Sequence, residues 1–279
     1  MKRHLYSKGS LISIIAVMLL SGMLSAQALW TDHGSDNSLS VELLKPFKSD
    51  SISTGFTGSS GTIFITGRYA LNEHIVLVGE VSVVHGDLEH EDFTNEAGTS
   101  MGNPYLGAEF HLAETPLFIE TGFRIPVFSK DKNVASLVGI ASDINRMEAF
   151  TPKIFPVLLA VNYEGQSAKN ILFRARLGTS IWFNSGNVSG SSSVDAVFDY
   201  MVQAGYAGQK LRVLIGITGR YLATLPGTDY SERHIKQFGT TITVPFGNIQ
   251  LGAHFKLPVN ENAGRMMDFV AGLNFGYNF

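Results

Sequence analysis

The residues of this chain that can do chemistry are its carboxylates, its basic side chains and its imidazoles. There are 24 Asp and Glu, 21 Lys and Arg and 8 His among the 279 residues, and there is no Cys. Without cysteine, the chain forms no disulfide, no thiolate nucleophile and no cysteine-based zinc site. The formal net charge of −3 provides no basic surface for nucleic acid. We therefore expect no nucleic-acid partner.

Two arrangements of these residues are candidates for reactive sites. His111, His234 and His254 are not spaced from a serine and a carboxylate in the manner of a hydrolase. Residues 85–92 read His-Gly-Asp-Leu-Glu-His-Glu-Asp, and such side chains can bind a divalent cation. Their spacing matches no defined calcium loop, and a solvated acidic loop is the commoner meaning of a charge run. The sequence thus predicts no enzyme, no metal site and no cofactor.

Charged residues also recur at every second position of long apolar segments. In the segment 171–184, Arg174 and Arg176 alternate with Phe173 and Leu177, and a period of two is the strand period. Such segments run for about 10 to 13 residues, whereas strands of soluble proteins average about 5 to 6. A tilted strand that crosses a membrane needs about 9 to 11 residues. The apolar face would then contact lipid and the polar face a lumen.

This pattern predicts an all-β fold, a transmembrane antiparallel up-and-down β-barrel of about 12 strands. The expected strands are 38–47, 61–70, 74–85, 102–112, 117–128, 153–163, 171–184, 195–206, 211–223, 234–246, 249–259 and 267–279. Their connections alternate between short and long, as the periplasmic turns and external loops of outer-membrane barrels do. Residues 129–152 fit this pattern least, and they are compatible with either a short helix or an extra strand.

The beginning of the sequence has the pattern of a secretory signal peptide. A basic stretch that ends at Lys8 precedes the apolar run Leu11–Leu24, and Ala26-Gln27-Ala28 supplies a cleavage site. The apolar run is short for a helix that spans a membrane, although an uncleaved anchor is the alternative. We predict a signal peptide at 1–28 and a single barrel domain at 29–279.

Aromatic residues mark one end of the expected barrel. The outward positions at which the even-numbered strands end include Tyr69, Phe110, Tyr163, Tyr206, Phe246 and Phe279. An aromatic belt at a membrane interface accounts for this set. The alternative is the general enrichment of aromatic residues in strands, but aromatic residues make up only 11% of the chain.

The sequence closes with Gly272 and then aromatic residues at alternate positions, Phe275, Tyr277 and Phe279. This ending resembles the C-terminal signature of bacterial outer-membrane β-barrel proteins. The resemblance implies a Gram-negative outer membrane, recognition of the last strand by the barrel-assembly machinery, and contact with outer-membrane lipid and lipopolysaccharide. Residues 102–107, Gly-Asn-Pro-Tyr-Leu-Gly, resemble a segment of some small transporter-like outer-membrane barrels, including those associated with the degradation of aromatic compounds.

Alternation assigns a set of charged and imidazole residues to the inner face of the barrel. These candidate pore-lining residues are Arg68, Glu80, Glu109, Glu120, Arg124, Arg174, Arg176, Asp199, Arg212, Arg220, His254 and Lys256. Acidic and basic walls favour a small polar solute, and arginine offers fixed donors to organic acids. The predicted function is a narrow channel for passive or facilitated diffusion. The alternative is a lumen filled by paired charges, in a non-conducting structural or adhesive barrel whose external loops bind a ligand.

Overall fold

The computed structural model describes residues 37–48, 54–56, 59–90, 96–185, 193–224 and 233–279. The predicted signal peptide at 1–28 lies outside these residues. The described strands are β1 (Ser38–Phe47), β2 (Thr54–Phe56), β3 (Gly61–Asn72), β4 (Ile75–His90), β5 (Glu96–Met101), β6 (Tyr105–His111), β7 (Leu117–Arg124), β8 (Ile154–Gln166), β9 (Ile171–Asn184), β10 (Val194–Ala207), β11 (Arg212–Leu222), β12 (His234–Phe246), β13 (Ile249–Pro258) and β14 (Phe269–Asn278). The predicted all-β class is confirmed.

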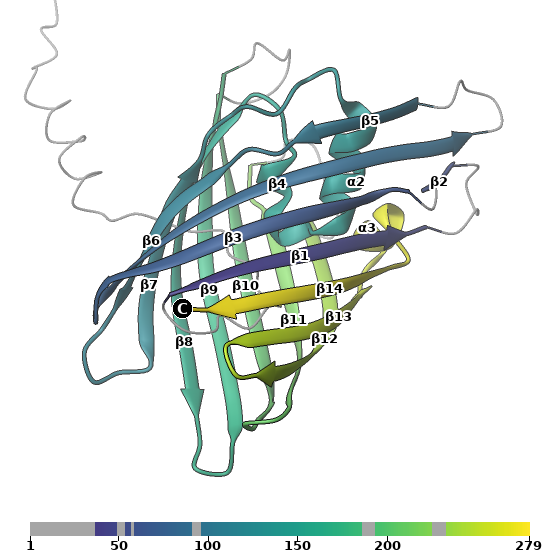
Figure 1. Cartoon of the computed structure of the whole chain (residues 1–279). Helices are drawn as coiled ribbons and strands as arrows, with labels where there is room; N and C mark the ends of the chain where they lie inside the picture. The colour runs from purple at the N-terminus through teal and green to yellow at the C-terminus, as the bar shows by residue number, and fades with distance from the viewer. Residues whose placement is uncertain (1–36, 49–53, 57–58, 91–95, 186–192, 225–232) are drawn as a thin grey trace, which may run out of the picture.

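Twelve of the strands in the described part of the chain form a closed antiparallel ring (Figure 1). The ring closes because β1 pairs with β14, from Ser38 opposite Asn278 to Phe47 opposite Phe269, and because β4 pairs with both β3 and β6. The short strands β2 and β5 extend the sheet on β4 beyond the ring. The predicted twelve-stranded barrel is confirmed.

Most strand boundaries lie within two residues of the prediction, but β4 runs five residues beyond the predicted end at 85, β8 runs three beyond the predicted end at 163, and two strands are shorter near prolines. β1, β9 and β12 have the predicted bounds. The strand expected from residue 102 begins only at Tyr105, and the strand expected to reach residue 128 ends at Arg124. Both predictions are wrong at these ends because Pro104 and Pro126 have no N–H to donate to a sheet.

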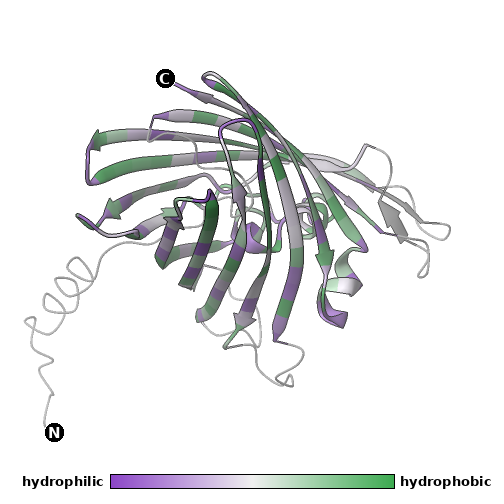
Figure 2. Cartoon of the chain, turned by 90° about the horizontal axis from the view of Figure 1, so that it is seen from below, coloured by the Kyte–Doolittle hydropathy of each residue, from purple (hydrophilic) through white to green (hydrophobic). Residues whose placement is uncertain are grey.

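Hydrophilic and hydrophobic residues alternate along the strands of the ring (Figure 2), and the two faces differ in polarity. On β1, the side chains of Leu39 and Leu43 are 46% and 45% exposed on the outer face, whereas Glu42 is 2% exposed on the inner face. Hydrophobic and hydrophilic residues alternate in the same way along the other strands. An apolar outer face on a closed barrel is the arrangement of a protein that spans a membrane with strands.

The two ends of the ring differ in their connections. The turn end carries the short connections, such as Gly247–Asn248, together with Asn37 and Phe279, whose N–H donates to the carbonyl of Asn37 at 3.1 Å. The loop end carries the long connections, including the short helix α3 (Glu261–Met266). No helix in the described part of the chain is long and apolar enough to cross a bilayer. The aromatic residues predicted to form a belt all lie on strands or connections at the turn end: Tyr69, Phe110, Tyr163, Tyr206, Phe246 and Phe279.

The connection between β7 and β8 folds back into the ring at the loop end (Figure 1). It forms α2 (Asn133–Ser142) and the 3-10 helix η1 (Ile144–Ala149), and we call residues 133–150 the plug. The carboxylate of Asp143 accepts a hydrogen bond from the N–H of Asn145 at 2.9 Å and so caps η1. Of the two alternatives for this region, the helix is correct.

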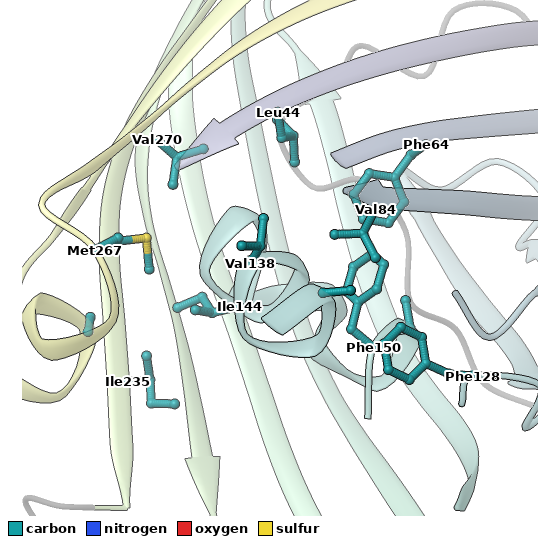
Figure 3. Packing of buried hydrophobic residues seen from close by; sticks show 13 residues of the cluster. Leu44, Phe64, Val84, Phe128, Val138, Ile144, Phe150, Ile235, Met267 and Val270 are labelled. Carbon is teal, nitrogen blue, oxygen red and sulfur yellow. The ribbon is translucent and has the colours of Figure 1, made fainter. Parts of the chain in front are cut away.

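The plug forms a hydrophobic core with the inner face of the wall (Figure 3). Val138, Ile144 and Phe150 have no exposed surface. The wall residues that pack around them come from one arc of the ring, which runs from β4 through β1 to β12: Leu44, Phe64, Val84, Ile235 and Val270. The plug therefore lies inside the ring, near the loop end, and packs against this arc of the wall.

Candidate functional site: the plug and the charged lumen

Arg146 of η1 is the centre of the polar contacts that hold the plug. Its guanidinium pairs with Asp143 of the plug at 2.8 Å, with Glu80 of β4 at 2.9 Å and with Glu42 of β1. Arg146 has no exposed surface. Burial lowers the pKa of Arg146, but the three carboxylates outweigh burial and raise the pKa above its ordinary value. Arg146 is therefore charged, and it neutralises buried carboxylates from two wall strands.

Asp143 joins the plug to a third strand of the wall. Its Oδ2 accepts hydrogen bonds from Nζ of Lys256 on β13 at 3.1 Å and from Nε of Arg146 at 3.0 Å. Burial raises the pKa of Asp143, but Lys256 and Arg146 outweigh burial and hold the pKa well below its usual value. Asp143 is therefore ionised at neutral pH, and its two ion pairs persist there.

Glu148, at the end of η1, binds a fourth strand. Nη1 of Arg220 on β11 donates to Oε2 of Glu148 at 2.9 Å, and Nη2 donates to the second carboxylate oxygen. Arg220 also donates to the carbonyl of Ile144 at 3.0 Å. Burial raises the pKa of Glu148, but the charge and hydrogen bonds of Arg220 outweigh it and lower the pKa. This two-point pair fixes the orientation of η1.

Asn103, just before β6, holds the two stretches of chain that enter and leave the plug. Its Oδ1 accepts from the N–H groups of Val127 at 2.9 Å and Phe128 at 2.8 Å. Its Nδ2 donates to the carbonyls of Glu148 at 2.8 Å and Thr151 at 2.9 Å. Asn103 has no exposed surface. One side chain thus satisfies four backbone groups of a connection that is otherwise irregular.

Close packing explains the segment 102–107 around Asn103. A Cβ on Gly102 would lie 2.9 Å from the carbonyl oxygen of Ala149 in the plug. The ring of Tyr105 lies over the space that a side chain at Gly107 would occupy, and its hydroxyl donates to a backbone carbonyl on β7 at 3.0 Å. Gly102 therefore permits the close approach of the plug to the wall.

The charged residues nearer the turn end pair with one another instead of with the plug. Arg68 of β3 makes two hydrogen bonds of 2.7 Å to Glu109 of β6. Arg176 of β9 pairs with Glu120 of β7 at 2.6 Å and with Asp199 of β10 at 3.1 Å. These pairs connect strands that are neighbours or next neighbours in the ring, so they line the wall without bridging the lumen.

The structure places all twelve candidate pore-lining residues on the inner face of the described strands. Glu80, Arg220 and Lys256 contact the plug directly. The others lie along the wall: Arg68, Glu109, Glu120, Arg124, Arg174, Arg176, Asp199, Arg212 and His254. Their inward position agrees with the alternation, and their part in solute passage stays a prediction.

The residues that hold the plug were missed among the candidates. They are Glu42, Asn103, Asp143, Arg146 and Glu148. Three of them belong to the connection whose structure the alternation did not predict. The available signal was its apolar composition, since a solvated loop has little reason to contain Val134, Leu137, Val138 and Ile140.

The structure describes only part of the acidic stretch 85–92. Glu91 and Asp92 of the acidic stretch lie outside the described residues, and no cluster of three or more metal-ligating side chains occurs within them. The sequence does contain a Gly-x-Ser-x-Gly string, Gly98-Thr99-Ser100-Met101-Gly102, which has the spacing of a nucleophile elbow, and the interpretation that no such string occurs is wrong. Ser100, however, lies on the extended strand β5, and its hydroxyl donates to the carbonyl of Met101 at 3.2 Å. An elbow requires a sharp turn from a strand into a helix.

No protein-family model matches the sequence, and no curated protein matches it significantly. Solved structures do match. The COG4313 outer membrane channel from Pseudomonas putida F1 is 14% identical with a TM-score of 0.58, over 91% of this chain and 100% of that one. The β domain of the Bordetella autotransporter BrkA is 9% identical with a TM-score of 0.52, over 88% and 100%. The translocator domain of the autotransporter NalP from Neisseria meningitidis is 10% identical with a TM-score of 0.51, over 97% and 96%.

This chain has the fold of the outer-membrane β-barrels. The closed ring and its apolar outer face agree with a location in the outer membrane. The low identities show the fold alone, so the role within the membrane is argued from the site. The assembly signal at Gly272, Phe275, Tyr277 and Phe279 stays a prediction. The structure shows β14 paired on both sides, with Phe275 and Tyr277 on the outer face.

Proposed function

We propose that this protein is a gated outer-membrane channel for passive or facilitated diffusion of a small polar solute, closed in this structure by its plug. The observation that supports the proposal is that the plug is a folded segment inside the ring and not part of its wall. Side chains fill a barrel of 8 strands, whereas wider barrels leave a lumen. Here that lumen is occupied by residues 133–150, which can withdraw without unpairing any strand of the ring.

The residues that the plug covers would be polar walls in the open channel. Withdrawal would expose Glu42, Glu80, Arg220 and Lys256, two acids and two bases. Balanced charge of this kind suits a small polar or zwitterionic solute better than an ion of one sign. In the closed state five of the candidate pore-lining arginines already have carboxylate partners, namely Arg68, Arg124, Arg174, Arg176 and Arg220. A preference for organic acids is therefore a narrower prediction.

We also propose an orientation of the barrel in the outer membrane, and we propose that the protein is not an enzyme. Short turns face the periplasm and long loops the exterior in outer-membrane barrels, so the plug would close the channel from outside. The assembly machinery and lipopolysaccharide are the expected partners. The alternative role is a non-conducting barrel whose external loops bind a ligand, and the complete burial of Val138, Ile144 and Phe150 favours it.

Conductance of the purified protein in planar bilayers tests the proposal. We expect infrequent stepwise openings, because the plug is held by ion pairs to four strands. A variant that weakens the plug, such as Asn103→Ala, should open more often. A protein that is folded but silent in both forms would contradict the channel and support the non-conducting barrel.

A further inference from the structure

The outer face of the ring carries a groove. It has a volume of about 590 Å³ and lies over β13, β14, β1, β3 and β4, which are neighbouring strands at the front of Figure 1. Its walls are mainly apolar and include Leu43, Phe47, Ile63, Val83, Ala271 and Leu273. Small-molecule sites span about 300 to 1,000 Å³, so the groove is large enough for part of a lipid.

The shape of the groove follows from strand pairing and small residues. β1 pairs with β3 only as far as Leu44 opposite Thr62, whereas its pairing with β14 continues to Phe47 opposite Phe269. Beyond Leu44, β1 is therefore paired with β14 but no longer with β3. The outward positions Gly61, Ala253 and Ala271 border this opening with little side-chain volume.

A cation lies at the end of the groove nearest the loop end. Lys45 points outward from β1, and its Nζ lies 5.3 Å from the ring centroid of Phe47. Lys45 is the only charged residue at an outward position on β13, β14, β1 and β3. His85 lines the groove two strands away on β4. A lysine on the lipid face costs about 2 to 4 kcal/mol at the bilayer midplane but only about 0 to 1 near the interface.

A carboxylate also lies near the groove. Asp87 of β4 accepts a hydrogen bond from Ser59 at 3.2 Å at the rim beyond His85. It is two strands away from Lys45, so the end of the groove on β4 has both an imidazole and a carboxylate, whereas the end on β1 and β14 has the ammonium group of Lys45. An anionic ligand would therefore place its charge against Lys45.

We propose that this groove binds lipopolysaccharide, with an acyl chain along the apolar floor and a phosphate of the headgroup at Lys45. The inference rests on the proposed membrane placement, which puts the loop end in the outer leaflet. Charge complementarity selects a phosphorylated lipid, since the cation of the groove lies at its headgroup end. The apolar walls select a lipid in place of a free phosphate.

The test measures binding of purified lipopolysaccharide to the full-length barrel in detergent after removal of bound lipid. Ala271→Phe fills the groove beside Lys45, because Ala271 lies opposite Lys45 in the β1–β14 pairing. Ala204→Phe is its control, since Ala204 is an exposed outward residue of β10 away from the groove. We expect Ala271→Phe to weaken binding at least fivefold and Ala204→Phe to leave it unchanged. Equal binding by the two variants would overturn the proposal.

A second experiment tests the contact between Lys45 and the phosphate of the lipid headgroup. Lys45→Gln should weaken binding about fivefold, the contribution of one lysine near an anionic membrane surface, and Lys236→Gln on β12 should change it less. Dephosphorylated lipopolysaccharide should bind the wild type as weakly as the phosphorylated form binds Lys45→Gln. Equal affinity of the wild type for both forms would overturn the phosphate contact.

A heat-modifiable band on a gel shows that each variant is folded. Loss of that band in the wild type would count against the barrel, whereas a folded wild type that binds no lipopolysaccharide would overturn this inference alone.

Discussion

The two halves of the lumen use the same residue types for different purposes. In the half near the turn end, wall arginines pair with wall carboxylates, as Arg68 does with Glu109 and Arg176 with Glu120. In the half near the loop end, the wall residues Glu42 and Glu80 pair with Arg146 of the plug. The wall of the first half is complete without the plug, whereas the wall of the second half depends on it. Under the proposed gating, the second half is therefore the one expected to change when the channel opens.

The largest difference between the halves is expected from Arg146→Met and Arg176→Met. Removing one partner of a buried ion pair costs about 3 to 5 kcal/mol, which shifts an equilibrium roughly 100-fold or more. In Arg146→Met this cost destabilises the closed state, in which the plug lies inside the ring. Single-channel recordings should therefore show a large rise in open probability. In Arg176→Met the same cost destabilises the wall, so the heat-modifiable band should convert at a lower temperature without more openings. Equal opening by the two variants would remove the distinction between the halves.

A smaller effect is expected from the asparagines. Asn103→Ala leaves four backbone groups of the plug connection without their partner, and each unsatisfied buried group costs about 1 to 3 kcal/mol when water cannot reach it. Open probability should rise, although less than in Arg146→Met because water can replace some of these bonds. Asn162→Ala is the control, since Asn162 is buried on β8 and contacts Glu120 and Arg176. An increase in opening with Asn162→Ala alone would contradict the role of Asn103.

The glycines should give a smaller change again. A Cβ at Gly139 would overlap the ring of Phe150, whereas a Cβ at Gly264 in α3 would meet nothing within 4 Å. Overpacking typically costs about 1 to 3 kcal/mol, and Ala in place of Gly returns about 0.5 to 1 kcal/mol in a helix. Gly139→Ala should therefore open the channel moderately and Gly264→Ala should not. Unchanged recordings for Gly139→Ala would show that the core with Phe150 does not hold the plug.

The smallest effect near neutrality is that of pH. Lys256 and Arg146 lower the pKa of Asp143 in the seated plug, and Arg220 lowers that of Glu148. A lowered pKa stabilises the seated state fully above the ordinary carboxylate pKa of about 4, and the stabilisation is lost as pH falls below that value. Open probability should stay constant from pH 8 to about pH 5 and rise only in stronger acid. A rise between pH 7 and pH 6 would contradict this assignment of the ion pairs.

The sequence predicted the wall because each wall residue is specified locally. Residues such as Arg174 and Arg176 alternate with apolar neighbours on the same strand, so their face follows from the strand period alone. The plug is specified by contacts between distant residues. Arg146 and Glu42 are 104 positions apart, and Lys256 and Asp143 are 113 apart. The alternation of residues along a strand cannot predict pairs between such distant positions. In addition, α2 has no side-chain cap that would mark its start.

The position of Asn103 could be predicted from local sequence, whereas its contacts with the plug could not. The sequence singled out residues 102–107 through a resemblance, and Pro104 explains why β6 begins where it does. The function of Asn103 depends on Val127 and Thr151, which its own segment does not predict. Local sequence rules therefore predict that Asn103 lies at a strand boundary. They do not predict its contacts with the plug, because these depend on how the closed ring positions residues that are distant in the sequence.

The most direct measurement of the central claim is the conductance of a tethered plug. Oγ1 of Thr62 on β3 donates to Oγ of Ser142 on α2 at 2.9 Å, and the chain has no other cysteine to interfere with a designed pair. In planar bilayers, oxidised Thr62→Cys/Ser142→Cys should be silent, because the disulfide holds the plug against the wall, and addition of a reductant should restore stepwise openings. If the oxidised and reduced forms conduct equally, the plug does not close the channel.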